Sequence, residues 1–332
     1  MPNLEVLAMF LAFHLIRLAR PIRQPAGRSA ACVPAAPGAP GVAGLPGTVH
    51  VAGVAGAQAA RVVALALFVA LAAAWRAPAQ DEWLPGPYEP VPRDALGTRL
   101  IDVPTPFPAG ARRLQVLFTH RFLLPVNQGD AHNFWGLDSG ADVGIGLTGG
   151  ITRNLDLSVF RSSFQENYEV AGKFLVFEQA RRVPASVALR VGADLLQRPG
   201  VGDRNRPFVQ LLFARRFAPG CNLLVSPSWV RDTPQLHNAF NAPVGVTVAL
   251  PARTLLEAEV IAATHRLRGS HTAWHAALSK PVGGHIFQLV AGNSRATTVD
   301  QYLGGDSAAG FKAGDVRLGF NLVRDFSFDR RK

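Results

Sequence analysis

The sequence predicts an all-β fold, an antiparallel transmembrane β-barrel of about twelve strands, and three observations lead to this prediction. Apolar residues alternate with polar or small residues through most of residues 112–328, as at Val143, Ile145 and Leu147. Hydrophobic residues make up 48% of the chain and charged residues only 17%. No apolar run in this region reaches the roughly 18 residues of a transmembrane helix. The connections between alternating stretches are short and long in turn.

A period of two gives each strand one apolar and one polar face. In a membrane, only closure into a barrel pairs every backbone hydrogen-bonding group of such strands. The alternative fold is a secreted soluble β-sandwich, which would carry a polar outer face. The Val, Leu, Ile and Phe residues at these positions favour the barrel.

Residues 61–79 have the features of a secretory signal peptide. Arg61 precedes an apolar run from Val62 to Trp75, and Ala77-Pro78-Ala79 places small residues before a cut at Gln80. A basic flank, an apolar core and an Ala-x-Ala exit are typical of export. A membrane anchor or a buried helix is the alternative, although the run is short for a span.

Residues 1–60 form a low-complexity extension rich in Ala, Gly, Pro and Val, a composition that cannot build a core. Because a signal peptide belongs at an N-terminus, our hypothesis is that translation begins near residues 51–62 and that Met1 is a mis-assigned start. A signal at residues 4–16 is the competing interpretation, but its basic residues follow the apolar run instead of preceding it.

Residues 80–111 are expected to be a periplasmic lead-in without regular structure, because proline is frequent there. A plug of the barrel lumen is the alternative. The prolines are Pro85, Pro87, Pro90, Pro92, Pro104, Pro106 and Pro108.

The barrel itself is expected over residues 112–328, and its strand count is even. An even count puts both ends of the barrel in the periplasm, where connections are usually short. The 163–167 connection is the exception, since it is short where a long one is expected. The candidate strands are 112–122, 137–148, 153–163, 167–178, 185–197, 206–217, 221–230, 240–250, 253–264, 272–280, 284–295 and 314–326.

Every second position of the last strand, which we call one parity of the strand, carries Leu318, Phe320, Leu322 and Phe326. Arg324 falls on the same parity. An aromatic-rich terminal strand of this kind resembles the signal recognised by the barrel-assembly machinery of the outer membrane. This machinery and outer-membrane lipid are therefore expected partners.

Four stretches of sequence, 118–122, 134–141, 150–155 and 161–163, carry a family resemblance. They read Phe-Thr-His-Arg-Phe, Phe-Trp-Gly-Leu-Asp-Ser-Gly-Ala, Gly-Ile-Thr-Arg-Asn-Leu and Arg-Ser-Ser. Within residues 118–173 the chain is similar to an uncharacterised family of bacterial outer-membrane β-barrel proteins, a domain of unknown function. The resemblance implies a porin-like barrel of unknown substrate and transfers no catalytic residues.

Charged residues on the polar parity of the strands are the candidate lining of the lumen. Glu257 and Glu259 share one face of a strand whose other face is apolar, so both should point inward. The side chains could form a mutually neutralising ion network, line a selective solute path or, as a third alternative, catalyse acid–base chemistry. The same parity test adds Lys173, Arg190, Asp194, His275 and Arg317.

His120, Arg121 and Asp138 lie at the ends of the first two strands, where the loop 123–136 begins and closes. We expect them to anchor this loop to the wall at the outer rim, with contact to a ligand as the alternative.

Four histidines, His265, His271, His275 and His285, cluster around one outer loop. A metal needs ligands that converge on one point, so polar lining is expected and metal or haem contact is the alternative. Two cysteines, Cys32 and Cys221, form neither a disulfide framework nor a CxxC pair. We predict no metal and no cofactor.

The function expected from these patterns is a porin-like channel for an unidentified small solute, in the outer membrane of a Gram-negative-type bacterium. The alternatives are a non-transporting structural or docking barrel and an outer-membrane enzyme. No GxSxG, HExxH, P-loop or CxxC motif is present, so we predict that the protein is not an enzyme. The net charge is +11, but the basic residues are spread out, so nucleic acid is not an expected partner, whereas anionic lipid or solutes are compatible.

Overall fold

The computed structural model describes residues 97–180, 183–196, 205–231, 233, 238–262, 271–304 and 315–328. The expected low-complexity extension, the signal peptide and residues 80–96 of the expected lead-in lie outside the described residues. Within the described part of the chain, no helix has the length and apolar character needed to cross a membrane.

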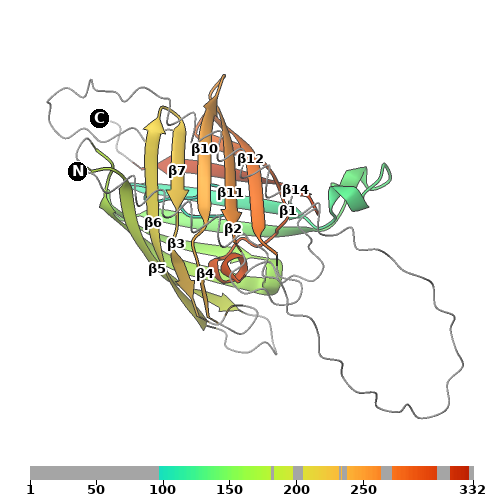
Figure 1. Cartoon of the computed structure of the whole chain (residues 1–332), viewed down its shortest axis with the longest axis horizontal. Coiled ribbons are helices and arrows are strands. Elements are labelled where there is room, and N and C mark those ends of the chain that lie inside the picture. Colours follow the sequence, from blue (N-terminus) through green and yellow to red (C-terminus); the bar gives the residue numbers. More distant parts are fainter. Residues whose placement is uncertain are drawn as a thin grey trace, which may run out of the picture. The chain divides into compact units, whose positions relative to one another are not determined.

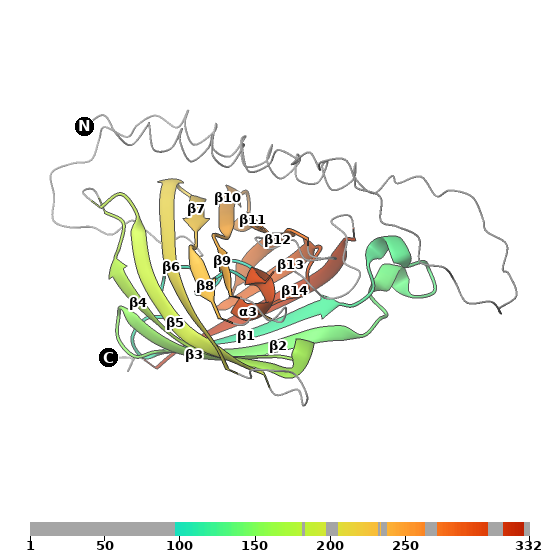
Figure 2. The ribbon, with the colours of Figure 1, turned by 60° about the horizontal axis from the view of Figure 1, so that its bottom comes forward.

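The described residues form a closed antiparallel β-barrel (Figures 1 and 2). Most strands pair with their sequence neighbours, except that β7 is not paired with β8 and β9 is not paired with β10, and the ring closes where β1 pairs with β14. The strands are β1 (Arg113–Phe122), β2 (Ala141–Gly150), β3 (Leu155–Ser162), β4 (Asn167–Phe177), β5 (Ser186–Leu196), β6 (Asn205–Ala218), β7 (Cys221–Val225), β8 (Ser228–Val230), β9 (Ala239–Asn241), β10 (Val244–Leu250), β11 (Thr254–Ile261), β12 (Ala273–Val282), β13 (His285–Gly292) and β14 (Arg317–Ser327).

Two prolines explain why fourteen segments make a twelve-stranded barrel. Pro227 separates β7 from β8, and Pro243 separates β9 from β10, because proline has no N–H to give to the sheet. The segments β7 and β8 both pair with β6 and continue one strand, and β9 and β10 pair with β8 and β7 and continue the next strand. The predicted all-β fold with about twelve antiparallel strands is confirmed.

The connections differ between the two ends of the barrel. One end, here the short-turn end, holds the start of β1, the end of β14 and tight turns such as Gly220 and Gly283-Gly284. The other, the long-loop end, holds three short 3-10 helices: η1 (Val126–Gln128) and η2 (Phe134–Gly136), which Figure 1 shows extending beyond β1, and η3 (Phe164–Glu166) in the short 163–167 connection.

The alternation seen in the sequence separates the two faces of the wall. Apolar side chains on one parity are exposed to the surroundings, including Ile145 and Leu256, as expected for a lipid-facing surface. The other parity is buried and mostly polar or small. A side chain at the buried position Gly144 would clash, because its Cβ would come within 2.4 Å of the Phe160 ring. The ring occupies the space that the glycine leaves.

Two segments enter the barrel and fill its lumen. Residues 97–109, the plug segment, precede β1, and Leu100, Ile101 and Val103 in it are almost fully buried. Residues 293–304, the inner loop, follow β13 and contain the helix α3 (Val299–Leu303), all of whose residues are buried. Figure 2 shows α3 within the ring of strands.

The position of the plug segment differs from the expected periplasmic lead-in and matches the alternative of a lumen plug. Its prolines do exclude regular structure, as expected. They do not exclude burial, because polar groups of the wall satisfy the backbone of the segment.

Candidate functional site

The seven residues selected by parity as lumen lining are all buried in the interior of the barrel, and none is more than 5% exposed. They are Lys173, Arg190, Asp194, Glu257, Glu259, His275 and Arg317. The structure does not gather them in one place. They belong to several clusters, and most of these clusters include residues of the plug segment or the inner loop.

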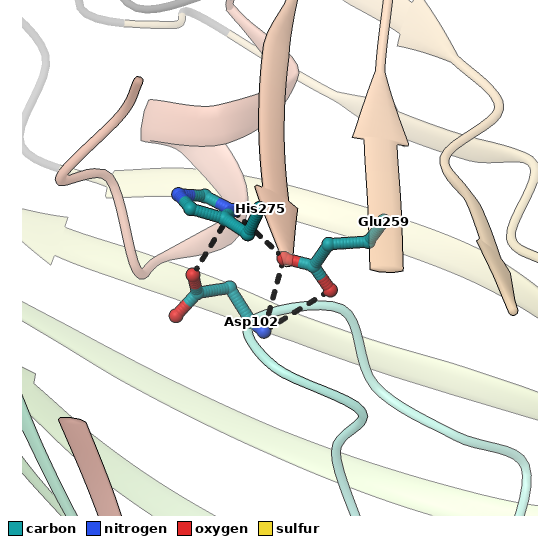
Figure 3. A group of neighbouring side chains, drawn as sticks. All are labelled: Asp102, Glu259 and His275. Carbon is teal, nitrogen blue, oxygen red and sulfur yellow. Dashed lines mark hydrogen bonds and ion pairs between the residues drawn. The ribbon is translucent and has the colours of Figure 1, made fainter. Parts of the chain in front are cut away.

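The central cluster joins the plug segment to the wall, and Figure 3 shows Asp102 of the plug segment beside Glu259 and His275 of the wall. Arg121 of β1 donates to both carboxylate oxygens of Asp102 at 2.9 and 3.1 Å and to Asn321 of β14 at 2.7 Å. The Asp102 backbone N–H donates to Glu259 of β11 at 3.1 Å. His275 of β12 lies 3.0 Å from Glu259 and 3.4 Å from Asp102 through Nδ1. A paired, bidentate geometry is what stabilises buried charge.

The hydrogen bonds of His275 indicate its protonation. Its Nδ1 faces the carboxylates, and its Nε2 lies 3.0 Å from the Ser294 carbonyl of the inner loop. Both partners carry acceptor oxygens, so an imidazolium, which donates from both ring nitrogens, would satisfy both contacts. His275 therefore links the wall, the plug segment and the inner loop.

Asp102, Glu259 and His275 also offer three metal-ligating atoms within 4.8 Å of one another. A metal would require a neutral ring, and it would lie beside the Arg121 guanidinium that already binds Asp102. With an imidazolium, two positive and two negative groups balance, whereas a divalent ion would leave excess positive charge in a buried place. The cluster thus fits a proton better than a metal ion.

A second cluster holds the backbone of the plug segment through Lys173 of β4. The Lys173 ammonium donates to the carbonyl oxygens of Thr98, Thr105 and Phe107 at 3.3, 3.2 and 2.7 Å. It also lies 3.5 Å from Asp156 of β3. One side chain thereby fixes both arms of the plug segment.

A third cluster, around Glu169 of β4, contacts both the plug segment and the inner loop, here together called the inserts. One carboxylate oxygen accepts from Arg99 of the plug segment and from Arg190 of β5, each at 2.5 Å. The other accepts from the Val299 N–H at the start of α3 at 3.0 Å. Arg99 also donates to the Thr297 carbonyl at 3.0 Å, so the two inserts meet inside the lumen.

The inner loop has its own anchors. Asp194 of β5 accepts from the Asp300 N–H at 2.9 Å, and Asp300 accepts from Arg206 of β6 at 2.6 Å and from Asn167 of β4 at 2.8 Å. In α3, which is not a membrane-spanning segment, burial raises the pKa of Asp300, and the nearby Arg206 guanidinium opposes that shift. The Tyr302 hydroxyl accepts from Gln210 at 3.1 Å.

The remaining two lining residues lie apart from these clusters. Glu257 of β11 accepts from Ser279 at 2.5 Å and from Gln288, which also donates to the Leu100 carbonyl at 2.9 Å. Arg317 lies at the long-loop end and donates to the Leu123 carbonyl at 3.2 Å.

The expected loop anchors at the outer rim do not come together. His120 faces outward and stacks on Phe320 with 4.9 Å between ring centroids. Arg121 faces inward to Asp102, and Asp138 is exposed. Consecutive residues of a strand point to opposite faces, so His120 and Arg121 cannot act together. None of these three residues ties the loop 123–136 to the wall by a described side-chain contact. Arg317 makes such a contact, through the Leu123 carbonyl.

The histidines also separate. His265 lies outside the described residues, His275 faces inward, and His285 faces outward beside Arg324, with 2.8 Å between Nδ1 and a guanidinium nitrogen. Parity alone places His275 and His285 on opposite faces.

Sequence reasoning missed several residues of the clusters. Asp156, Glu169 and Arg206 lie on the buried parity of their strands, so the same parity test could have found them. Arg99, Asp102 and Asp300 lie in the inserts, which have no periodicity from which burial can be read.

The cavities confirm how completely the lumen is filled. Two cavities beside the plug segment have volumes of only about 20 Å³ each, close to that of one water molecule. A larger cavity of about 490 Å³, here the vestibule, opens at the short-turn end. The plug segment therefore packs closely against the wall at the two small cavities.

Comparisons with known proteins agree with this architecture. A family model described as "Membrane bound beta barrel domain (DUF5777)" matches residues 96–326. No curated protein sequence matches significantly.

Among solved structures, the chain is similar to outer membrane phospholipase A from Escherichia coli, with 12% identity and a TM-score of 0.37 over 64% of this chain and 89% of that one. It is also similar to a mutant porin of Rh. blastica, with 16% identity and a TM-score of 0.30 over 56% of this chain and 55% of that one. Similarities this distant carry no argument about activity.

Proposed function

Because the chain belongs to the family of membrane-bound β-barrel domains, we propose that it is an outer-membrane channel for a small solute, closed by its own plug segment and inner loop. The observation that carries this proposal is the plug segment, which is buried in the lumen and held by side chains of β1, β4, β11, β13 and β14. In this conformation the barrel does not conduct.

The chemistry of the wall supports reversible closure. The plug segment is bound mainly by charged and amide side chains, which water can solvate equally well when the segment leaves. An apolar lumen would instead require a permanent apolar filling. The charged lining predicted from the sequence is therefore compatible with both a closed and a water-filled state.

The proposed location and partners follow from the same features. The exposed apolar parity fits outer-membrane lipid, and β14, with Phe320 and Phe326 on its outer face, fits recognition by the barrel-assembly machinery. The signal peptide at residues 61–79 would supply export.

Conductance across a planar lipid bilayer tests the proposal. The wild-type protein should be silent or open rarely. Lys173→Met removes the donor that binds three plug carbonyls, so it should open more often. Thr247→Val is the matched control, because this buried wall hydroxyl donates to Gly220 and accepts from Asn222. Steady wild-type conductance equal to that of Lys173→Met would contradict closure by the plug segment.

The second candidate is a non-transporting structural or docking barrel, and the nearly complete filling of the lumen favours it. It predicts silence from the wild-type protein, from Lys173→Met and from a deletion of residues 97–109 that still folds. We propose a structural role for the central cluster, because the Asp102 and Glu259 carboxylates and the His275 ring are already paired with Arg121, with backbone N–H groups and with one another.

A further inference from the structure

The vestibule at the short-turn end has a volume of about 490 Å³. This volume lies in the range of small-molecule sites. Thr98, Phe107 and Pro108 of the plug segment form its floor, and the start of β1 and the turns before β11 and β13 form its walls. A molecule in the vestibule would therefore touch the element that closes the channel.

The charged groups of the vestibule are predominantly basic. Arg113, at the start of β1, and Arg253, in the turn between β10 and β11, line it from different sides, since β14, β13 and β12 separate β1 from β11 in the sheet. Neither guanidinium has a side-chain partner among the described residues. The carboxylate that lines the cavity, Asp325, accepts a hydrogen bond from Gln115 at 2.8 Å.

The backbone at Arg253 is a second, independent observation. Ala252 and Arg253 have φ values of 59° and 57°, in the left-handed region that suits Gly or Asn. An arginine is therefore poorly suited to this turn by conformation alone, and the strain is explained if its side chain is needed at the vestibule.

The surroundings of the mouth strengthen its positive potential. Arg153, Arg215, Lys280 and Arg324 lie at the turns and strand ends of the same end of the barrel, where Glu178 is the acidic neighbour of Arg153 at 3.5 Å. A mouth with an excess of basic groups concentrates anions.

We propose that the vestibule binds a small anionic solute whose carboxylate or phosphate oxygens pair with Arg113 and Arg253, while an apolar part contacts Phe107 and Ile286. Guanidinium groups bind both kinds of oxyanion in a bidentate manner. The idea that this anion is also the transported solute rests on the proposed function. Binding itself does not require that the barrel conduct.

Arginine modification on the intact full-length protein in detergent tests the site. Phenylglyoxal is added with or without citrate, inorganic phosphate or uncharged glycerol, and modified arginines are quantified by peptide mass spectrometry. We expect citrate or phosphate to slow modification of Arg113 and Arg253, and glycerol to have no effect. Arg153, exposed in another turn of the same end, is the internal control and should stay unprotected. Whichever anion protects at the lower concentration identifies the carboxylate or phosphate class.

Titration calorimetry with the same anion gives the second readout. Arg253→Gln and Arg113→Gln should each weaken binding about tenfold, the factor for one charge-assisted interaction, and Arg153→Gln should not change it. Equal protection of all three arginines would mean general charge screening and would overturn the site. If Arg113 and Arg253 were modified slowly and no anion changed the rate, the vestibule would already be covered by the protein's own chain. This result would also overturn the site.

These measurements are separate from conductance. A bilayer that stays silent with Lys173→Met and with the deletion of residues 97–109 would remove the channel function and leave the anion site in place. If no anion protected Arg113 and Arg253 but the Lys173→Met variant conducted, the anion site would be removed and the channel function would remain.

Discussion

The plug segment and the inner loop fill the same lumen from opposite ends of the barrel, but the wall holds them by different groups. The plug segment is bound largely through its backbone, by Lys173 and Gln288 at its carbonyls and Glu259 at its N–H groups. The inner loop is bound largely through the side chains of Asp300 and Tyr302 and the first N–H groups of α3. Backbone anchoring tolerates changes of plug sequence, whereas side-chain anchoring does not.

The charged side chains of Arg99 and Asp102 are exceptions within the plug segment, and Asp102 gives the largest expected effect. Arg121→Met leaves the Asp102 carboxylate buried without its bidentate partner, so the free energy of unfolding should fall by about 3–5 kcal/mol. Denaturant unfolding in lipid vesicles measures it.

The double variant Arg121→Met/Asp102→Asn is the matched control, and it should recover part of the loss because no unpaired plug carboxylate remains. Equal stability of single and double variants would show that the pair does not hold the plug segment.

The wall can be tested independently of both inserts. Ala258 faces outward between the inward Glu257 and Glu259, so Ala258→Arg should cost roughly 2–4 kcal/mol if it lies near the middle of the bilayer. Glu257→Gln should assemble normally. Assembly in an outer-membrane fraction, measured by heat-modifiable migration on a gel, distinguishes them, and the opposite result would reverse the assigned faces.

The inner loop should open locally when its side-chain anchor is weakened. Asp300→Asn removes the charge that pairs with Arg206, so hydrogen exchange should accelerate at residues 299–303 while residues 100–103 of the plug segment stay protected. Faster exchange in both segments would mean that the contact between Arg99 and Thr297 makes the two inserts a single gate.

A conservative change in the plug segment should have a small effect. Ile101→Val removes one methylene group from a fully buried side chain, which costs about 0.5–1.5 kcal/mol. Its backbone carbonyl, which accepts from Asn321 at 3.2 Å, is unchanged. A loss as large as that of Arg121→Met would contradict backbone anchoring.

The wall and the inserts also differ in what the sequence reveals. Alternation predicted the strands to within a few residues, for example 206–217 against the observed Asn205–Ala218, because each strand has one lipid face and one buried face. The same rule placed Glu259 and His275 inside. It could not place Asp102 or Asp300, because an irregular insert obtains its position from individual contacts with distant strands, and Asp102 is 157 residues from Glu259.

The smallest expected effect on stability belongs to the topology test, which uses Cys221. This free cysteine begins β7, directly after the tight turn that follows β6, at the same end as the start of β1. If short turns face the periplasm, a maleimide too large for any pore should not label Cys221 in intact cells and should label it after permeabilisation. A cysteine at exposed Asn238, at the long-loop end, should react in both cases. One at Gly202, a position outside the described residues but in a predicted outer loop, should behave like Asn238. Labelling of Cys221 in intact cells would invert the barrel and place the basic vestibule on the outside of the cell.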